Sequence, residues 1–182
     1  YAIDIGERNR KNTLRWNEVY KDCLHVLDMS VLSLSFSDGY FGFVHSNGVL
    51  HHTTDPFKGF QELVRVCEPG GHIVVGLYGR GGLFPGLISA LRVVVRYLPF
   101  SFVSHLISWL FPQPYDQYLV LDFLFVPIVN RYTEPEVRAW FEAVGAREIK
   151  RHRLHSRYQQ GSWWSRLLHG AGYITMSGRK PS

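Results

Sequence analysis

The sequence predicts an α/β fold whose sheet is mostly parallel. His72–Tyr78 contains the continuous apolar run Ile73-Val74-Val75, which is typical of a parallel strand buried on both faces. A helix-like segment that begins at Asp55 precedes it, and a strand-like segment, Phe41–Ser46, precedes that helix. A strand, a helix and a second strand in this order imply a right-handed parallel crossover. The 182 residues, 46% of them hydrophobic, predict a single domain over 1–182.

Two short apolar segments near the beginning of the chain predict further strands. They are Ala2–Ile5 and Leu24–Asp28, and each carries an acidic residue at or near its end. The polar and basic segment between them, Glu7–Asp22, predicts a mostly exposed helix. The turn signal Asp38-Gly39 then precedes the strand that begins at Phe41.

The helix before the buried strand has clear signals at both ends. Asp55 can cap it, Pro56 suits the first helical position, and Pro69-Gly70-Gly71 ends it. Apolar residues recur at helical spacing along its buried face: Phe57, Phe60, Val64 and Cys67.

The last third of the chain predicts one more helix and an antiparallel edge to the sheet. Thr133-Glu134-Pro135-Glu136 matches a capping box at a helix start, and Gly145 matches a helix end. The segments 146–158 and 173–179 are β-like, and we expect them to pair as a C-terminal edge hairpin.

An apolar insert at about 83–130 separates these parts of the chain. Its most apolar section, Leu83–Phe111, is interrupted by Pro85, Arg92 and Arg96, which would be costly in a helix that spans a bilayer. We expect a pair of helices that covers an apolar acceptor as a lid or makes a peripheral membrane contact through 83–111. Core packing and a dimer surface are the alternative interpretations.

The composition argues against several classes of function. The net charge is +5, but the basic residues are spread along the chain, so we expect no nucleic-acid partner. Cys23 and Cys67 have no second Cys or His at zinc-ligand spacing, so we expect no metal site and no disulfide framework. The expected location is cytoplasmic, with membrane association as an option.

Three motifs occur in a characteristic order: Leu34–Phe41, Ser46–Pro56 and Arg65–Gly71. Their order and spacing resemble those of class I S-adenosyl-L-methionine (SAM) dependent methyltransferases, in particular the type 11-like group, over about residues 1–80. The resemblance implies a Rossmann-like sheet, SAM as cofactor, and methyl transfer to oxygen, nitrogen or carbon of a small-molecule acceptor. Asn130–Thr133 with Trp140-Phe141 resembles bacterial members that modify small molecules or glycan precursors, which implies an apolar or glycan-linked acceptor.

The resemblance also implies which residues bind the adenosine part of the cofactor. Asp4, followed by Ile5, would accept from both ribose hydroxyls, while Asp28 and Met29 would contact the adenine. In the alternative interpretation these are solvated strand-end acids beside a core methionine. The candidates do lie at the carboxyl ends of predicted strands, where open α/β sheets bind ligands.

The end of the next strand provides candidates for the rest of the cofactor and for catalysis. Ser46, Asn47 and Gly48 would lie under the methionine part, with Gly48 allowing close backbone approach. His51 and His52 are candidates for a base or for orienting the substrate, because imidazole titrates near neutral pH. The alternatives are a simple loop and a histidine pair with one packed and one exposed ring.

The candidates for binding the acceptor follow the buried strand or lie in and after the insert: Tyr78, Arg80, Tyr118 and Arg131. A flexible turn is the alternative for the first two. The glycines of Gly79–Gly82 also resemble a phosphate-binding loop, but no acidic residue occurs between Glu68 and Asp116 to bind a ribose.

The sequence departs from the family pattern at two places. The family begins with a strand and a glycine-rich loop, whereas this chain opens inside what corresponds to the second strand, so we expect an N-terminally incomplete fold and a fragment. Gly42 also replaces the acid that usually follows Phe41. The alternative function is therefore a catalytically inactive fragment or binding module that acts through its apolar insert.

Overall fold

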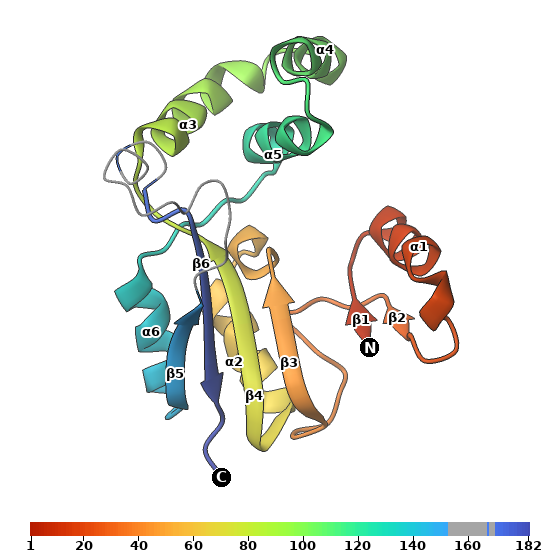
Figure 1. Cartoon of the computed structure of the whole chain (residues 1–182), viewed down its shortest axis with the longest axis vertical. Helices are drawn as coiled ribbons and strands as arrows, with labels where there is room; N and C mark the ends of the chain where they lie inside the picture. Colours follow the sequence, from red (N-terminus) through yellow and green to blue (C-terminus); the bar gives the residue numbers. More distant parts are fainter. Residues whose placement is uncertain (153–166, 168–169) are drawn as a thin grey trace.

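The main sheet contains four strands in the order β3-β4-β6-β5. The computed structural model describes residues 1–152, 167 and 170–182 (Figure 1). The four strands are β3 (Phe41–Asn47), β4 (Cys67–Tyr78), β5 (Arg147–His152) and β6 (Tyr173–Arg179). A separate two-stranded sheet pairs β1 (Ala2–Ile3) with β2 (Val26–Leu27) in parallel.

The directions of the strands confirm the predicted α/β class. β3 and β4 are parallel and are joined through α2 (Pro56–Val66), which is the expected crossover. β6 is antiparallel to both β4 and β5, so the predicted antiparallel pairing near the C-terminus is also confirmed. Of these two C-terminal strands, however, β5 alone lies at an edge of the sheet, and β6 lies inside it. Residues 153–158 of the predicted first strand lie outside the described residues.

β4 begins at Cys67, five residues before the predicted start at His72. Phe41 pairs with Cys67 whereas Phe43 pairs with His72, so the register shifts at Gly42 and β4 bulges around Pro69–Gly71. A Cβ atom on Gly42 would lie 3.0 Å from the Glu68 carboxylate. An aspartate there would bring two carboxylates together, which is a physical reason for glycine at this departure from the family pattern.

The hydrophobic core lies between one face of the sheet and two helices, α2 and α6 (Glu134–Ala143). Ile73, Val75 and Leu77 of β4 are fully buried there. On the other face Val74 is only half-buried and His72 is exposed. The prediction that both faces of this strand are buried is therefore wrong for the part of the chain that the structure describes. Its continuous apolar run does not distinguish one covered face from two.

The helical pair predicted over 83–111 is confirmed as α3 (Leu83–Val95) and α4 (Phe100–Leu110). The rest of the insert adds a third helix that was not predicted, α5 (Pro114–Phe125). The three helices extend beyond the carboxyl ends of β3 and β4 (Figure 1). Their facing side chains form a hydrophobic cluster separate from the main core. Its buried members are Ile88, Val95, Val103, Ile107, Val120 and Leu124. Among the described residues, no helix is long and apolar enough to cross a membrane.

The N-terminal part differs in detail from the prediction. The expected helix over Glu7–Asp22 ends at Trp16 as α1 (Glu7–Trp16) and continues as a 3-10 turn, η1 (Glu18–Tyr20). None of the residues of α1 is buried, which confirms the prediction of an exposed helix. The predicted strands are shorter than expected, with two residues each. The pairing extends slightly beyond them, because the Ala2 N–H donates to the His25 carbonyl and the Asp4 N–H donates to the Leu27 carbonyl.

The start of α6 forms the predicted capping box. The Glu136 carboxylate accepts hydrogen bonds from the Thr133 backbone N–H at 2.6 Å and from its hydroxyl at 2.8 Å. These bonds, together with the charge of Arg80, hold the pKa of Glu136 below its usual value.

We expect Thr133→Ala to lower the free energy of unfolding by about 1 kcal/mol, measured by urea denaturation. Glu142→Ala, at the exposed far end of this helix, is the control; equal losses in both variants would contradict the role of the cap.

Candidate functional site

Four side chains meet beyond the carboxyl ends of β3 and β4. His51 and His52 lie on η2 (Leu50–His52), Tyr78 is the last residue of β4, and Asp122 comes from α5 of the insert. The Tyr78 hydroxyl donates to Asp122 Oδ2 at 2.9 Å, and His52 Nε2 lies 3.7 Å from the same oxygen. The structure thus brings three predicted site residues together with a carboxylate that was not predicted.

His51 is the fully buried member of this cluster. Burial, with a smaller contribution from His52, lowers the pKa of His51 to about 3. The Tyr78 backbone N–H donates to His51 Nδ1 at 3.3 Å, so the neutral ring carries its proton on Nε2. Nε2 has no hydrogen-bond partner among the described residues. His51 is therefore a buried neutral donor near neutral pH, which makes it a poor general base.

His52 has the geometry of a general base. Its Nδ1 lies 2.8 Å from the Ile128 carbonyl oxygen, which can only accept, so Nδ1 carries the proton. Nε2 is then free to take a second proton, and Asp122 is near enough to stabilise the resulting cation. The two adjacent histidines thus differ, and His52 is the better candidate of the two.

Asp122 connects the insert to the sheet. Burial and the neighbouring Asp122 carboxylate raise the pKa of Tyr78, so its phenol keeps the proton that it donates. The sequence did carry a signal for this residue, because an acid between Leu121 and Phe123 in an apolar helix needs a partner.

The residues predicted to bind the methionine part of the cofactor lie at the end of β3 and directly after it. The Ser46 side chain is buried, and its hydroxyl has no hydrogen-bond partner among the described residues. Asn47 Oδ1 accepts from the Tyr173 hydroxyl at 2.7 Å, and Gly48 has a φ of 76° that favours glycine. Tyr173, which the sequence reasoning missed, thus fixes this loop from β6.

A groove of about 520 Å³ separates β1 from β3. Ile3 lines one side, and Val44, Ser46 and Asn47 line the other. Among the described residues β1 pairs only with β2, and β3 pairs only with β4. The other edge of β1 and the other edge of β3 are therefore unpaired and border this groove. Its volume is in the range of small-molecule and cofactor sites.

The predicted adenosine-binding residues lie together but are already hydrogen-bonded. Asp4 accepts from the Gly6 N–H at 2.6 Å and from Asn9 Nδ2 at 3.2 Å. Arg10, another residue that sequence reasoning missed, donates to the Asp4 carbonyl at 2.8 Å and forms a 3.0 Å ion pair with Asp28. None of these residues lines the groove.

The two apolar residues predicted beside these acids have different surroundings. Ile5 is 73% exposed, whereas Met29 packs against the main core and accepts from the Ser35 N–H.

The predicted acceptor-binding residues do not form one group. Tyr78 belongs to the cluster described above, and Tyr118 is exposed on α5. Arg80 forms a 3.0 Å ion pair with Glu136 and donates to the Arg131 carbonyl, which secures the capping box of α6. Arg131 donates to the Pro85 carbonyl and to the Ser89 hydroxyl, so it attaches the insert to the segment that follows it.

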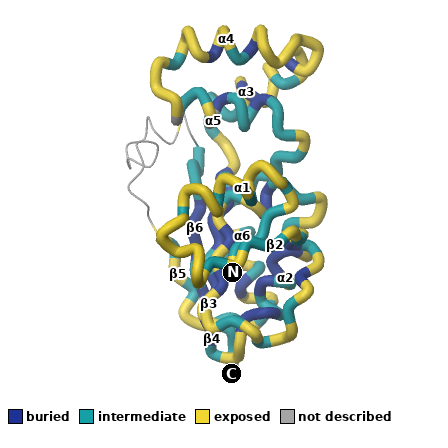
Figure 2. Tube along the Cα trace, turned by 90° about the vertical axis from the view of Figure 1, so that its right-hand side faces the viewer, coloured by how far each residue is buried: buried dark blue, intermediate teal, exposed yellow. Residues whose placement is uncertain are grey.

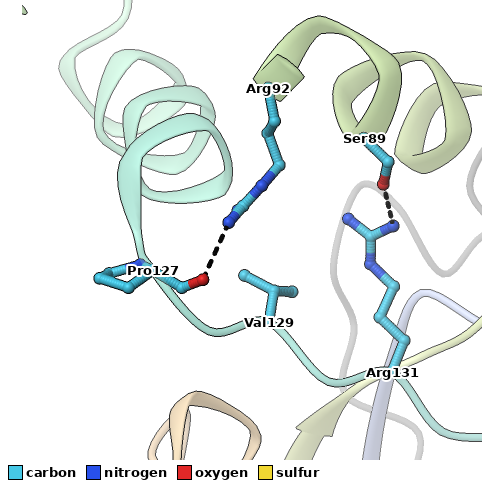
Figure 3. A pocket seen from close by; sticks show the side chains of 5 residues that line it. All are labelled: Ser89, Arg92, Pro127, Val129 and Arg131. Carbon is cyan, nitrogen blue, oxygen red and sulfur yellow. Dashed lines mark hydrogen bonds between the residues drawn. The ribbon is translucent and has the colours of Figure 1, made fainter. Parts of the chain in front are cut away.

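A smaller cavity of about 230 Å³ lies where α3 meets residues 127–131 (Figure 3). Arg92 and Arg131 both line it, and Arg92 donates to the carbonyls of Phe123 and Val126. Burial, assisted by the charge of Arg92, lowers the pKa of Arg131. Among the described residues neither arginine forms an ion pair. In the same part of the chain, no group of three or more His, Cys, Asp or Glu side chains lies close enough together to hold a metal ion.

Comparison with known proteins places this chain beside methyltransferases. Residues 1–75 match the model of the family described as "Methyltransferase domain". A SAM-dependent methyltransferase of Thermotoga maritima is 15% identical, with a TM-score of 0.60 over 98% of this chain and 72% of its own. The 1,6-didemethyltoxoflavin-N1-methyltransferase of Burkholderia thailandensis, solved with bound S-adenosylhomocysteine, is 16% identical, with a TM-score of 0.53 over 100% and 60%.

These structural similarities cover nearly the whole length of this chain, but they cover only part of the length of the other proteins. A protein of Bordetella parapertussis is 15% identical, with a TM-score of 0.59 over 99% of this chain and 52% of its own. The fold is that of class I methyltransferases, with a Rossmann-like sheet, and the resemblance inferred from the three motifs is confirmed. The expectation that the chain is a fragment stays a prediction, as do the roles of the individual site residues.

The lowered pKa of His51 predicts a pH-dependent stability. The unfolded imidazole has a pKa near 6.5 and the folded one a pKa of about 3, so acid protonates the unfolded state first. The free energy of unfolding should therefore fall from about pH 6.5 downward, by up to about 1.4 kcal/mol per pH unit, and His51 should contribute no slope above that range. Urea denaturation of the parent and of His51→Asn between about pH 5 and pH 7 checks this; equal slopes would show that His51 is not the cause.

Proposed function

We propose that this chain belongs to a SAM-dependent methyltransferase and that it transfers the methyl group to a small-molecule acceptor. The cluster of His52, Tyr78 and Asp122 carries this proposal. It lies beyond the carboxyl ends of β3 and β4, where open α/β sheets bind their ligands. The family match over residues 1–75 and the neighbour that binds S-adenosylhomocysteine support the choice of cofactor.

Residues that line the groove, together with Asp4 directly after the groove-lining Ile3, have the chemistry to hold this cofactor. The unpartnered Ser46 hydroxyl and the Asn47 side chain can bind its amino-acid part. A carboxylate has about four acceptor positions, so Asp4 can accept from a ribose although Gly6 and Asn9 use two of them. Bound SAM would supply a methyl group on a positively charged sulfur.

His52 would remove the proton from the acceptor. When a hydroxyl or amine of the acceptor takes the methyl group that bound SAM would supply, His52 Nε2 would take the proton that the acceptor loses. Asp122, 3.7 Å away, stabilises the cation, and Tyr78 holds Asp122 in place through its hydroxyl. His51 would donate from its unpartnered Nε2 to the acceptor or to the cofactor. Alignment of the reactants supplies much of the rate in such a transfer.

The surroundings of Tyr78 favour an acceptor with an apolar part. Phe123 of the insert lies with its ring centroid 4.8 Å from that of Tyr78, and Arg131 lies over the same Phe123 ring at 5.7 Å. Such a site suits a flat or apolar molecule with one polar group, including one attached to a glycan.

A binding module without activity is the second candidate. The ion pair between Arg10 and Asp28 favours it, because this carboxylate is already neutralised by a partner within the chain. Such a module would bind neither SAM nor its product at the groove.

Binding of S-adenosylhomocysteine tests the cofactor site without knowledge of the acceptor. Calorimetric titration should give binding to the parent chain, and Asp4→Ala should weaken it at least tenfold, about 1.4 kcal/mol, by removing the acceptor for the ribose. Glu18→Ala, an exposed acid of the same region, is the control. No binding by the parent would favour the binding module, and unchanged affinity of Asp4→Ala would remove Asp4 from the site.

Variants of the cluster test the proposed chemistry. With radiolabelled SAM and a pool of small-molecule acceptors, His52→Gln should lower methyl transfer by about 10²-fold or more, because the proton then has no acceptor. Asp122→Asn should also lower it, whereas the affinity for S-adenosylhomocysteine should stay the same in both variants. Asp116→Asn, on the same helix, is the control. Full activity of His52→Gln would exclude it as the base.

A further inference from the structure

The outer sides of the insert carry apolar side chains that no described residue covers. On α3 the exposed residues Leu83, Leu87, Leu91 and Val94 follow at i, i+4, i+8 and i+11, so they form one stripe. On α4 the exposed residues Phe102, Leu106 and Trp109 follow at i, i+4 and i+7 and form a second stripe. We call these two stripes the apolar face of the insert.

The apolar face is not needed for folding the insert. The insert already has its own core, to which α3 contributes Ile88 and Val95 and α4 contributes Val103 and Ile107. The apolar surface of α4 thus extends beyond the side chains that pack in this core. Figure 2 shows α4 at the end of the molecule farthest from the C-terminus, with most of its length exposed. Exposed apolar side chains that gather along two helices in this way mark an interaction site.

The charged side chains of α3, α4 and the turn between them are of one sign. No acidic residue occurs between Glu68 and Asp116, whereas Arg92 and Arg96 lie at the end of α3. Arg96 is exposed and stacks at 4.7 Å on the ring of Tyr97. This composition attracts an anionic surface, while a second copy of the same face would bring only like charges.

Two aromatic residues fit a bilayer: Trp109 of the apolar face, and Tyr97 in the turn between α3 and α4. Trp109 is 79% exposed and Tyr97 is 74% exposed, and these two residue types favour the boundary between lipid chains and headgroups. The helices are too short to cross the bilayer, so they would lie along its surface. We infer that the apolar face docks peripherally on the surface of an anionic lipid bilayer. This inference does not depend on the proposed enzymatic activity.

Flotation with lipid vesicles tests the inference on the whole chain. The parent should float with vesicles of phosphatidylcholine and phosphatidylglycerol and less with phosphatidylcholine alone, and added salt should weaken the difference. The triple variant Phe102→Ser, Leu106→Ser, Trp109→Ser should lose at least about tenfold in partitioning. Arg96→Gln should lose about fivefold on anionic vesicles only.

The control variant removes equally exposed apolar side chains elsewhere. Trp16→Ser with Val19→Ser, at residues 80% and 90% exposed, should float like the parent. Circular dichroism of each variant should match that of the parent, because all of these side chains are exposed. A parent that does not float, or a triple variant that floats equally well, overturns the inference. So does a parent that forms a dimer which the triple variant dissociates, since the face would then bind a second copy.

Discussion

Pairing along both edges of β4 is the constraint on which the rest of the structure depends. This strand forms hydrogen bonds to the parallel strand β3 on one edge and to the antiparallel strand β6 on the other. On one of its faces the side chains of Ile73, Val75 and Leu77 are fully buried. Buried backbone groups must be paired, so neither neighbour can shift by one residue without exposing its apolar side chains. The helices α2 and α6 then pack on a surface whose register is already fixed.

The site depends on the carboxyl end of the same strand. Tyr78 uses its backbone N–H to hold His51, which is 27 residues earlier in the chain, and its hydroxyl to hold Asp122, which is 44 residues later. One residue thus positions the turn after β3 and a helix of the insert. Because both bonds start from the end of a well-paired strand, the cluster has a rigid base although its other three members come from a turn and from the insert.

The sequence predicts the elements whose signals are local. The cap at Asp55, the capping box at Thr133 and the apolar run of β4 each define their element within a few residues. The position of β6 inside the sheet is not local, because it depends on which of two strands hydrogen-bonds to β4. Asp122 was missed for the same reason. Its place in an apolar helix indicates that it needs a partner, but the partners Tyr78 and His52 lie far away in the sequence.

The two faces of α5 link the insert to the site. Val120 and Leu124 belong to the core of the insert, whereas Asp122, two residues from each, points to the sheet. Arg92 of α3 donates to the carbonyls of Phe123 and Val126 and so holds the end of this helix. Any contact that moves α3 or α4 as a body therefore also moves Asp122 relative to His52. At 3.7 Å a small displacement changes the Coulomb interaction between these two side chains, so the geometry of the cluster depends on the position of the insert.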